Sequence, residues 1–168
     1  MAAMSTFAAR AFSMALFLAA IALVSACAGG GAPAGPTFAQ VAAQLPPVPP
    51  DRARIFFYRD YEPYESLSRP YVLLNGEVAG ISEPGGVFYR DVAPGRYVVS
   101  VQSHTLYPGQ DKTLDLHPGE TAYVKIESIK SYNSGDSTYD PDTFAVVVVN
   151  PADAQRDIAP KRYFPNGS

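Results

Sequence analysis

Residues 71–81 read YVLLNGEVAGI, and this stretch gives the clearest indication of the class of fold. The pair Asn75-Gly76 separates two short runs of strand-forming residues. Both members of the pair accept positive φ, which the tight two-residue turn of a hairpin requires. The stretch therefore predicts an antiparallel hairpin with strands over 71–74 and 77–81.

Strand patterns continue on both sides of this hairpin. Upstream, residues 54–59 (RIFFYR) are rich in β-formers. Downstream, Pro-Gly pairs at 94–95 and 118–119 each predict a turn that leads into an alternating strand. In the predicted strand over 122–127 we expect Val124 and Ile126 to point inward. The remaining predicted strands span 87–90, 96–102, 113–116 and 122–127.

The most apolar stretch after the N-terminal region is residues 144–149 (FAVVVV). It is apolar on both faces, which predicts a central, buried strand. Asn150-Pro151 follows, with the residue types favoured at the N-cap and first position of a helix. We therefore expect a short helix over 151–158.

These elements predict an all-β domain, a small antiparallel β-sandwich of about seven to eight strands. The predicted domain covers residues 51–160, and a polar tail covers residues 161–168. With 168 residues, the chain has room for one ordinary domain.

The N-terminal 26 residues have the composition of a secretory signal peptide. Arg10 is their only charge, and residues 11–24 form an uncharged apolar run. This run is shorter than the roughly 20 residues that a membrane-spanning helix needs.

The run Leu23-Val24-Ser25-Ala26-Cys27 resembles the lipobox of bacterial lipoproteins. The resemblance implies that the Cys27 thiol receives a diacylglycerol and that a signal peptidase cuts before it. Acyl chains would then hold the protein in membrane lipid. Ala28, where retained lipoproteins carry Asp, implies sorting to the outer membrane, with the domain facing the periplasm. The alternatives are a plain N-terminal anchor, or an ordinary signal cut nearby with Cys27 incidental.

Residues 27–50 then form a tether that is rich in Gly and Pro and has no charge. Its apolar residues Phe38, Val41, Ala42 and Leu45 have the spacing of a helical stripe, and Thr37 is a candidate cap. This segment is either a short unstable turn or a docking helix that lies on the domain or the membrane surface.

The stretches 53–59, 72–80 and 92–99 together resemble DUF2846, a family of bacterial lipoproteins and envelope proteins. The hairpin and the following Pro-Gly turn are also similar to PEGA-type and transthyretin-like sandwich modules. The resemblance covers residues 52–130 and implies a small β-sandwich with no established activity. It supplies no catalytic residues to carry over.

Composition argues against several classes of function. Residues 27–168 contain 12 basic and 16 acidic side chains, a net charge of −4, which disfavours nucleic acid. The single cysteine and the two separated histidines, His104 and His117, predict no zinc site. We find no catalytic set and predict no enzyme activity, no metal and no cofactor.

Tyrosine stands out, because all 11 tyrosines follow residue 51 and there is no tryptophan. Tyr58, Tyr61, Tyr64 and Tyr71 cluster around the predicted loop 60–70. They are candidate partner-binding residues, since tyrosine suits recognition surfaces. The simpler interpretation is that strands favour tyrosine.

The sequence therefore predicts a membrane-anchored envelope lipoprotein, with lipid on Cys27, whose sandwich binds another envelope protein. The alternative is a peptidoglycan or glycan binder that uses the tyrosine-rich loop. Tryptophan usually leads stacking on sugars, and its absence disfavours this alternative.

Overall fold

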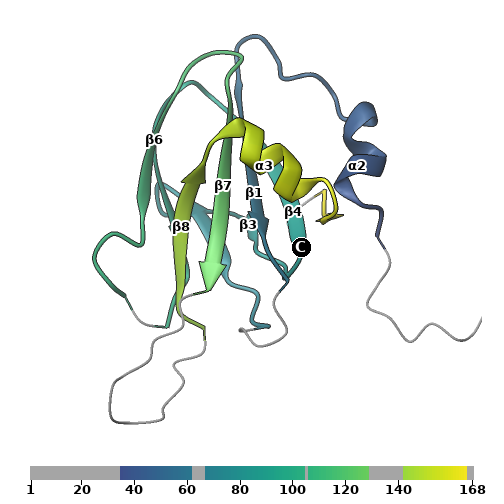
Figure 1. Ribbon diagram of the computed structural model, residues 1–168. Helices are drawn as coiled ribbons and strands as arrows, with labels where there is room; N and C mark the ends of the chain where they lie inside the picture. The colour runs from purple at the N-terminus through teal and green to yellow at the C-terminus, as the bar shows by residue number, and fades with distance from the viewer. Residues whose placement is uncertain (1–34, 62–66, 105, 129–141, 166–168) are drawn as a thin grey trace, which may run out of the picture. The chain divides into compact units, whose positions relative to one another are not determined.

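The structure of the chain is a computed structural model that describes residues 35–61, 67–104, 106–128 and 142–165. Nine strands within these residues form two sheets, shown in Figure 1. The strands are β1 Ala53–Arg59, β2 Tyr71–Leu74, β3 Glu77–Ile81, β4 Gly86–Val92, β5 Gly95–Val101, β6 Lys112–Leu116, β7 Thr121–Ser128, β8 Phe144–Val149 and β9 Arg162–Tyr163. Three helices accompany them, α2 Phe38–Val41, η2 Ala42–Gln44 and α3 Pro151–Ile158.

The two sheets pack face to face as a β-sandwich, which confirms the predicted class of fold. The larger sheet has the order β8-β7-β1-β4-β9, and the smaller sheet has the order β3-β2-β5-β6. Neighbouring strands run antiparallel, except that β1 pairs in parallel with β7 and β4 with β9. All eight predicted strands are present, and β9 is one that the sequence did not predict.

The hairpin forms as expected between β2 and β3. Asn75 has φ 52° and Gly76 has φ 84°, the positive values that a two-residue turn needs. The Asn75 side chain also accepts a hydrogen bond from the Val98 N–H of β5 at 2.8 Å. The turn therefore fixes the end of β2 against the next strand as well as against β3.

The central buried strand is β1, and the prediction of a central position for residues 144–149 was wrong. All seven residues of β1 are buried, whereas β8 lies at the edge of the larger sheet. The apolar pattern of β8 has another cause. Phe144 and Val146 face the core between the sheets, and Val149 packs into a second apolar cluster on the outer face.

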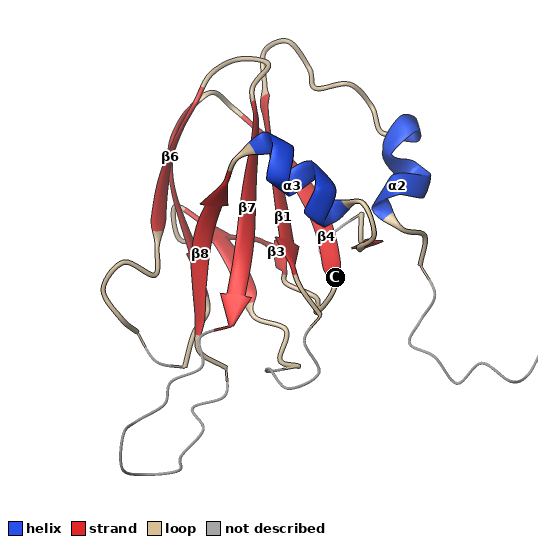
Figure 2. Cartoon of the chain, in the orientation of Figure 1, coloured by secondary structure: helices blue, strands red, loops and turns tan. Residues whose placement is uncertain are grey.

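The second cluster forms beneath α3. This helix begins at the predicted residue, Pro151. Asn150 is the N-cap, and its side-chain oxygen accepts a hydrogen bond from the Asp153 N–H at 3.0 Å. Ala154 and Ile158 are buried against the larger sheet. Figure 2 shows α3 lying across the strands of this sheet. The outer face of the larger sheet is therefore covered.

The segment around α2 covers the same face, so the structure shows a docking helix on the domain. The Phe38 ring meets the Phe56 ring edge-on at 5.3 Å. The Phe38 N–H donates to the Lys161 carbonyl at 2.7 Å, and the Tyr163 N–H donates to the Pro36 carbonyl at 2.9 Å. The folded unit thus extends beyond 51–160 at both ends.

Candidate functional site

Tyr58, one of the predicted partner-binding tyrosines, lies inside the folded unit. It is only 2% exposed, and its hydroxyl donates a hydrogen bond to the Asp157 carboxylate of α3 at 3.0 Å. Burial, together with the hydrogen bond to Asp157, raises the pKa of the Tyr58 hydroxyl above its ordinary value. The side chain fastens α3 to β1 and offers no surface to a partner.

The remaining predicted site residues differ in their placement. Tyr61, just beyond β1, is 63% exposed, and Tyr71, at the start of β2, is 46% exposed. Tyr64 and the lipid-attachment residue Cys27 lie outside the described residues. Two of the four tyrosines are therefore available at the surface, and their role in binding stays a prediction.

A cluster of charges lies where β1 ends. The Asp60 carboxylate accepts hydrogen bonds from Lys161 and from Lys125 Nζ, which is 2.8 Å away. Lys125 Nζ also lies 3.3 Å from Glu127. Burial raises the pKa of Asp60, but the hydrogen bonds from the two ammonium groups lower it more, so it lies below its ordinary value. Because opposite charges face each other here, the cluster ties β1, β7 and the C-terminal segment together.

The two histidines lie in different surroundings. The His117 ring is exposed and lies 3.1 Å from the Glu120 carboxylate of the same turn. His104 lines an open hollow of about 400 Å³ together with Arg69 and Asp142. Among the described residues, no three His, Cys, Asp or Glu side chains are grouped so as to hold a metal ion.

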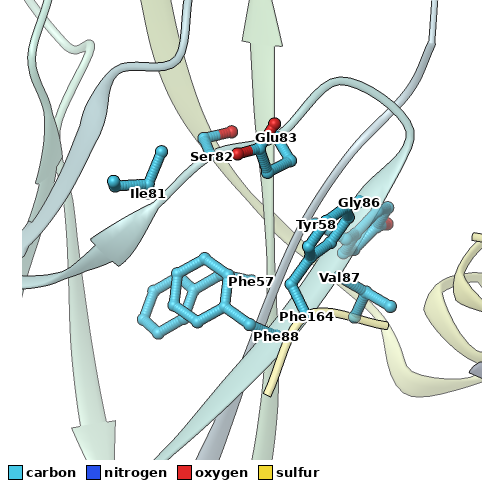
Figure 3. Close-up of a pocket in the computed structure, with 9 residues that line it drawn as sticks. All are labelled: Phe57, Tyr58, Ile81, Ser82, Glu83, Gly86, Val87, Phe88 and Phe164. Atoms are coloured by element: carbon cyan, nitrogen blue, oxygen red, sulfur yellow. The ribbon is translucent and has the colours of Figure 1, made fainter. Parts of the chain in front are cut away.

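A further hollow lies below the loop from β3 to β4, as Figure 3 shows. The Phe57 and Phe88 rings stack within it, with centroids 5.0 Å apart. No water-sized space remains between its side chains, so it is close-packed core and no ligand site. Its lining residues are Phe57, Tyr58, Ile81, Ser82, Glu83, Gly86, Val87, Phe88 and Phe164.

Helices cover one outer face of the sandwich but not the other. The larger sheet carries α2 and α3, whereas no described helix or strand packs over the outer face of the smaller sheet. That face exposes Tyr71 at 46%, Val78 at 60% and Val98 at 44%. Leu73 stands beside Val78 on the neighbouring strand. We call these four residues the bare patch.

A groove opens beside the bare patch, between β3 of the smaller sheet and β4 of the larger sheet. Its volume is about 380 Å³. Apolar side chains from both sheets meet in it, and charged side chains stand at its sides. The lining residues are Leu74, Asn75, Glu77, Val78, Ala79, Arg90, Asp91, Val92 and Tyr97.

Asp91, on one side of the groove, is held by an ion pair. Arg54 Nε and Nη2 donate to its two carboxylate oxygens at 2.7 and 2.8 Å. Arg54 Nη1 donates to the Pro46 carbonyl at 2.8 Å, and the guanidinium lies 4.1 Å from the centre of the Tyr89 ring. These contacts hold this side of the groove in place and link it to the docked N-terminal segment.

Sequence reasoning did not predict the bare patch or the groove. The outward apolar residues Val78 and Val98 are visible in the sequence as departures from apolar-polar alternation. The departures alone do not say which outer face lacks a cover, because that depends on where α2 and α3 pack.

A comparison with models of known families gives a match. The profile of a family described as "Protein of unknown function (DUF2846)" matches residues 49–137, more than half of the chain. No curated protein matches it. None of the helices in the described part of the chain has the length and apolar character to cross a membrane.

Proposed function

The chain belongs to the DUF2846 family, and we propose that it is a lipid-anchored envelope protein whose sandwich domain binds another protein without catalysis. The observation that carries the proposal is the asymmetry of the sandwich. One outer face is covered by the chain's own helices, and the other exposes the bare patch. A cluster of apolar side chains left in water is a common mark of a protein-binding surface.

The position of the docked segment supports this proposal. Only seven residues of chain, 28–34, lie between Cys27 and Gly35, where the folded unit begins. Fully extended, the Cα-to-Cα steps from Cys27 to Gly35 span at most about 28 Å. A lipid on Cys27 would hold the domain near the membrane by its covered face. The bare patch lies on the opposite side of the sandwich and would be accessible to a partner.

Lipidation is tested with Cys27→Ser in cells fed labelled palmitate. We expect the variant to lose the label and to leave the membrane fraction. Retention of both the label and the membrane association would show that the anchor lies elsewhere.

Protein binding is tested by placing a photo-reactive residue at Val98, the residue that β5 contributes to the bare patch. The matched control places it at Gln155, an exposed position on α3. We expect a specific protein adduct from position 98 and none from position 155. A second change in the same chain, Val78→Lys at another exposed residue of the bare patch, should reduce the adduct at least tenfold with an unchanged melting temperature. Equal yields from both positions, or no adduct, would contradict the proposal.

Glycan binding is the second candidate, and the exposure of Tyr61 is the observation that favours it. Isolated peptidoglycan sacculi would then retain the chain, and Tyr61→Ala would release it. Retention that depends on Tyr61 and not on Val98 would replace protein binding with glycan binding.

A further inference from the structure

The groove beside the bare patch lies between two strand edges. β3 is the last strand of the smaller sheet, so no described strand pairs with its outer side. On the facing sheet, the pairing of β4 with β9 covers only Gly86 and Val87. The groove is therefore an open seam of the sandwich, with a free strand edge along it.

The opposite seam is closed by the chain itself. Gln110, which precedes β6, accepts a hydrogen bond from the Val146 N–H of β8 at 2.8 Å. The Gln110 side chain donates to the Phe144 carbonyl at 2.9 Å. The outer side of β9 is also engaged, because the Tyr163 N–H donates to the Pro36 carbonyl. The chain thus engages the outer edge of β8 at Phe144 and Val146 and that of β9 at Tyr163, whereas no described strand pairs with the outer edge of β3.

A β-bulge shapes the open seam. Leu73 pairs with Val78, but Val72 pairs with Gly80, so Ala79 is an extra residue in β3. Consecutive residues of a regular strand point to opposite faces, yet Val78 and Ala79 both line the groove. Bulges are frequent at sheet edges and beside functional sites, where they redirect side chains.

The composition of β3 gives this edge little protection against an added strand. The side chains that blunt natural edge strands are Lys, Pro and other charged residues; short strand length and bulges protect an edge as well. Glu77 is the only charged residue in β3, which contains neither Lys nor Pro. β6, at the other end of the same sheet, carries both Lys112 and Asp115.

We infer that an extended segment of the partner protein adds a strand to the free edge of β3 and places apolar side chains in the groove between the sheets. This inference rests on the proposed function and names how the partner is held. Backbone hydrogen bonds to β3 give affinity, and the groove selects the side chains that alternate along the added strand. Val78 belongs to both the groove and the bare patch, so the added strand also extends that apolar surface.

The chemistry of the groove defines the segment that fits. Leu74 and Ala79 are less than 10% exposed and form its apolar base. Asp91 is already neutralised by Arg54. The segment that fits this groove has an apolar residue at every second position and no acidic residue beside Glu77.

The first experiment places the photo-reactive residue at Val78 in the full chain in cells, beside the Val98 and Gln155 positions used above. Mass spectrometry identifies the partner residues that crosslink to position 78. A synthetic peptide of about ten residues with that sequence is then titrated into the purified chain. We expect Val78→Lys to weaken the binding of the peptide at least tenfold, whereas Val148→Lys, at an exposed position of β8, should not.

N-methylation of the peptide tests strand addition itself. Methyl groups on the backbone nitrogens that face β3 should abolish binding, and methyl groups on the alternate nitrogens should leave it within about twofold, because strand hydrogen bonds alternate. Binding that is insensitive to methylation at both sets would overturn strand addition. Adducts from position 98 without any from position 78 would overturn the groove inference but leave the proposed function standing, whereas adducts from neither would defeat both.

Discussion

At the scale of single residues, the polar side chains near the larger sheet have structural roles. Tyr58 and Asp157 join β1 to α3, and Asp60 joins two lysines from different segments. Each of these contacts connects residues far apart in the sequence. Substitutions here should therefore change stability rather than binding.

Tyr58→Phe should lower the free energy of unfolding by about 1–2 kcal/mol, because it removes a hydrogen bond to a carboxylate and leaves the ring in place. Tyr71→Phe is the matched control, since Tyr71 is 46% exposed, and it should change stability by less than about 0.5 kcal/mol. Urea unfolding of both variants checks the prediction. Equal effects would mean that the contact with Asp157 adds nothing.

Asp60→Asn should lower stability at neutral pH by about 1 kcal/mol, a modest amount because the carboxylate is partly exposed and screened. The pKa of Asp60 is lowered from 3.8 in the folded chain. Its contribution is therefore present above that value and is lost as the pH falls below it. The difference between wild type and variant should shrink as unfolding is measured from about pH 7 down to about pH 3.

The control for Asp60 is Asp115→Asn, because Asp115 pairs with Arg96 on an exposed part of β6. That variant should unfold like the wild type across the same pH range. A pH-independent loss of stability in Asp60→Asn would contradict the assignment to ionisation.

Among the strands, the position within the sheet determines how deeply each side chain is buried and which residue types can be accommodated there. β8 is apolar throughout, yet it lies at an edge, and Val146 is 1% exposed whereas Val148 is 46% exposed. β1 has more charged residues than β8 but lies at the centre of the sheet. Its Arg54 is tolerated there because Asp91 and the Pro46 carbonyl satisfy the guanidinium.

Val146→Asp should prevent folding, because an unpaired charge between the sheets costs several kcal/mol, against roughly 5–15 kcal/mol for a whole domain. Val148→Asp, two residues along the same strand, should fold with a nearly unchanged melting temperature. Far-UV circular dichroism and thermal unfolding compare the two. A folded Val146→Asp variant would place that side chain outside the core.

At the scale of the whole molecule, the folded unit has a third layer that the sequence did not define. The segment from Pro36 to Pro46 packs on the outer face of the larger sheet and bonds to Lys161, Tyr163 and Arg54. This layer brings the two ends of the described chain together. It also shortens the length of chain that is left to act as a tether.

A chain that begins at Gly35 should be as stable as one that begins at Cys27. A chain that begins at Asp51 should stay rich in β-structure but lose about 2–4 kcal/mol, because the packing of Phe38 on Phe56 is removed. Denaturant unfolding of the three chains measures this loss. Equal stability of the two shorter chains would mean that the docked segment contributes nothing.

The local features of this protein could be predicted from its sequence. The hairpin at Asn75-Gly76, the strands with their inward Val124 and Ile126, and the cap of α3 at Asn150 all follow from residues a few positions apart. Turn, strand and cap preferences act over that range, so the all-β class was predictable. The exposed Tyr61 and Tyr71 were identified as candidates on the same local grounds.

The order of the strands and the location of the candidate site could not be predicted in this way, because they depend on how distant segments pack together. The central place of β1, the addition of β9 to β4 and the docking of Phe38 depend on pairings between distant segments. An apolar pattern shows that a side chain needs cover, but not which element supplies it. Tyr58 was therefore predicted to be a surface residue. The bare patch and the open edge of β3 could be identified only from the structure, which shows that α2 and α3 pack on the larger sheet and that β3 ends the smaller one.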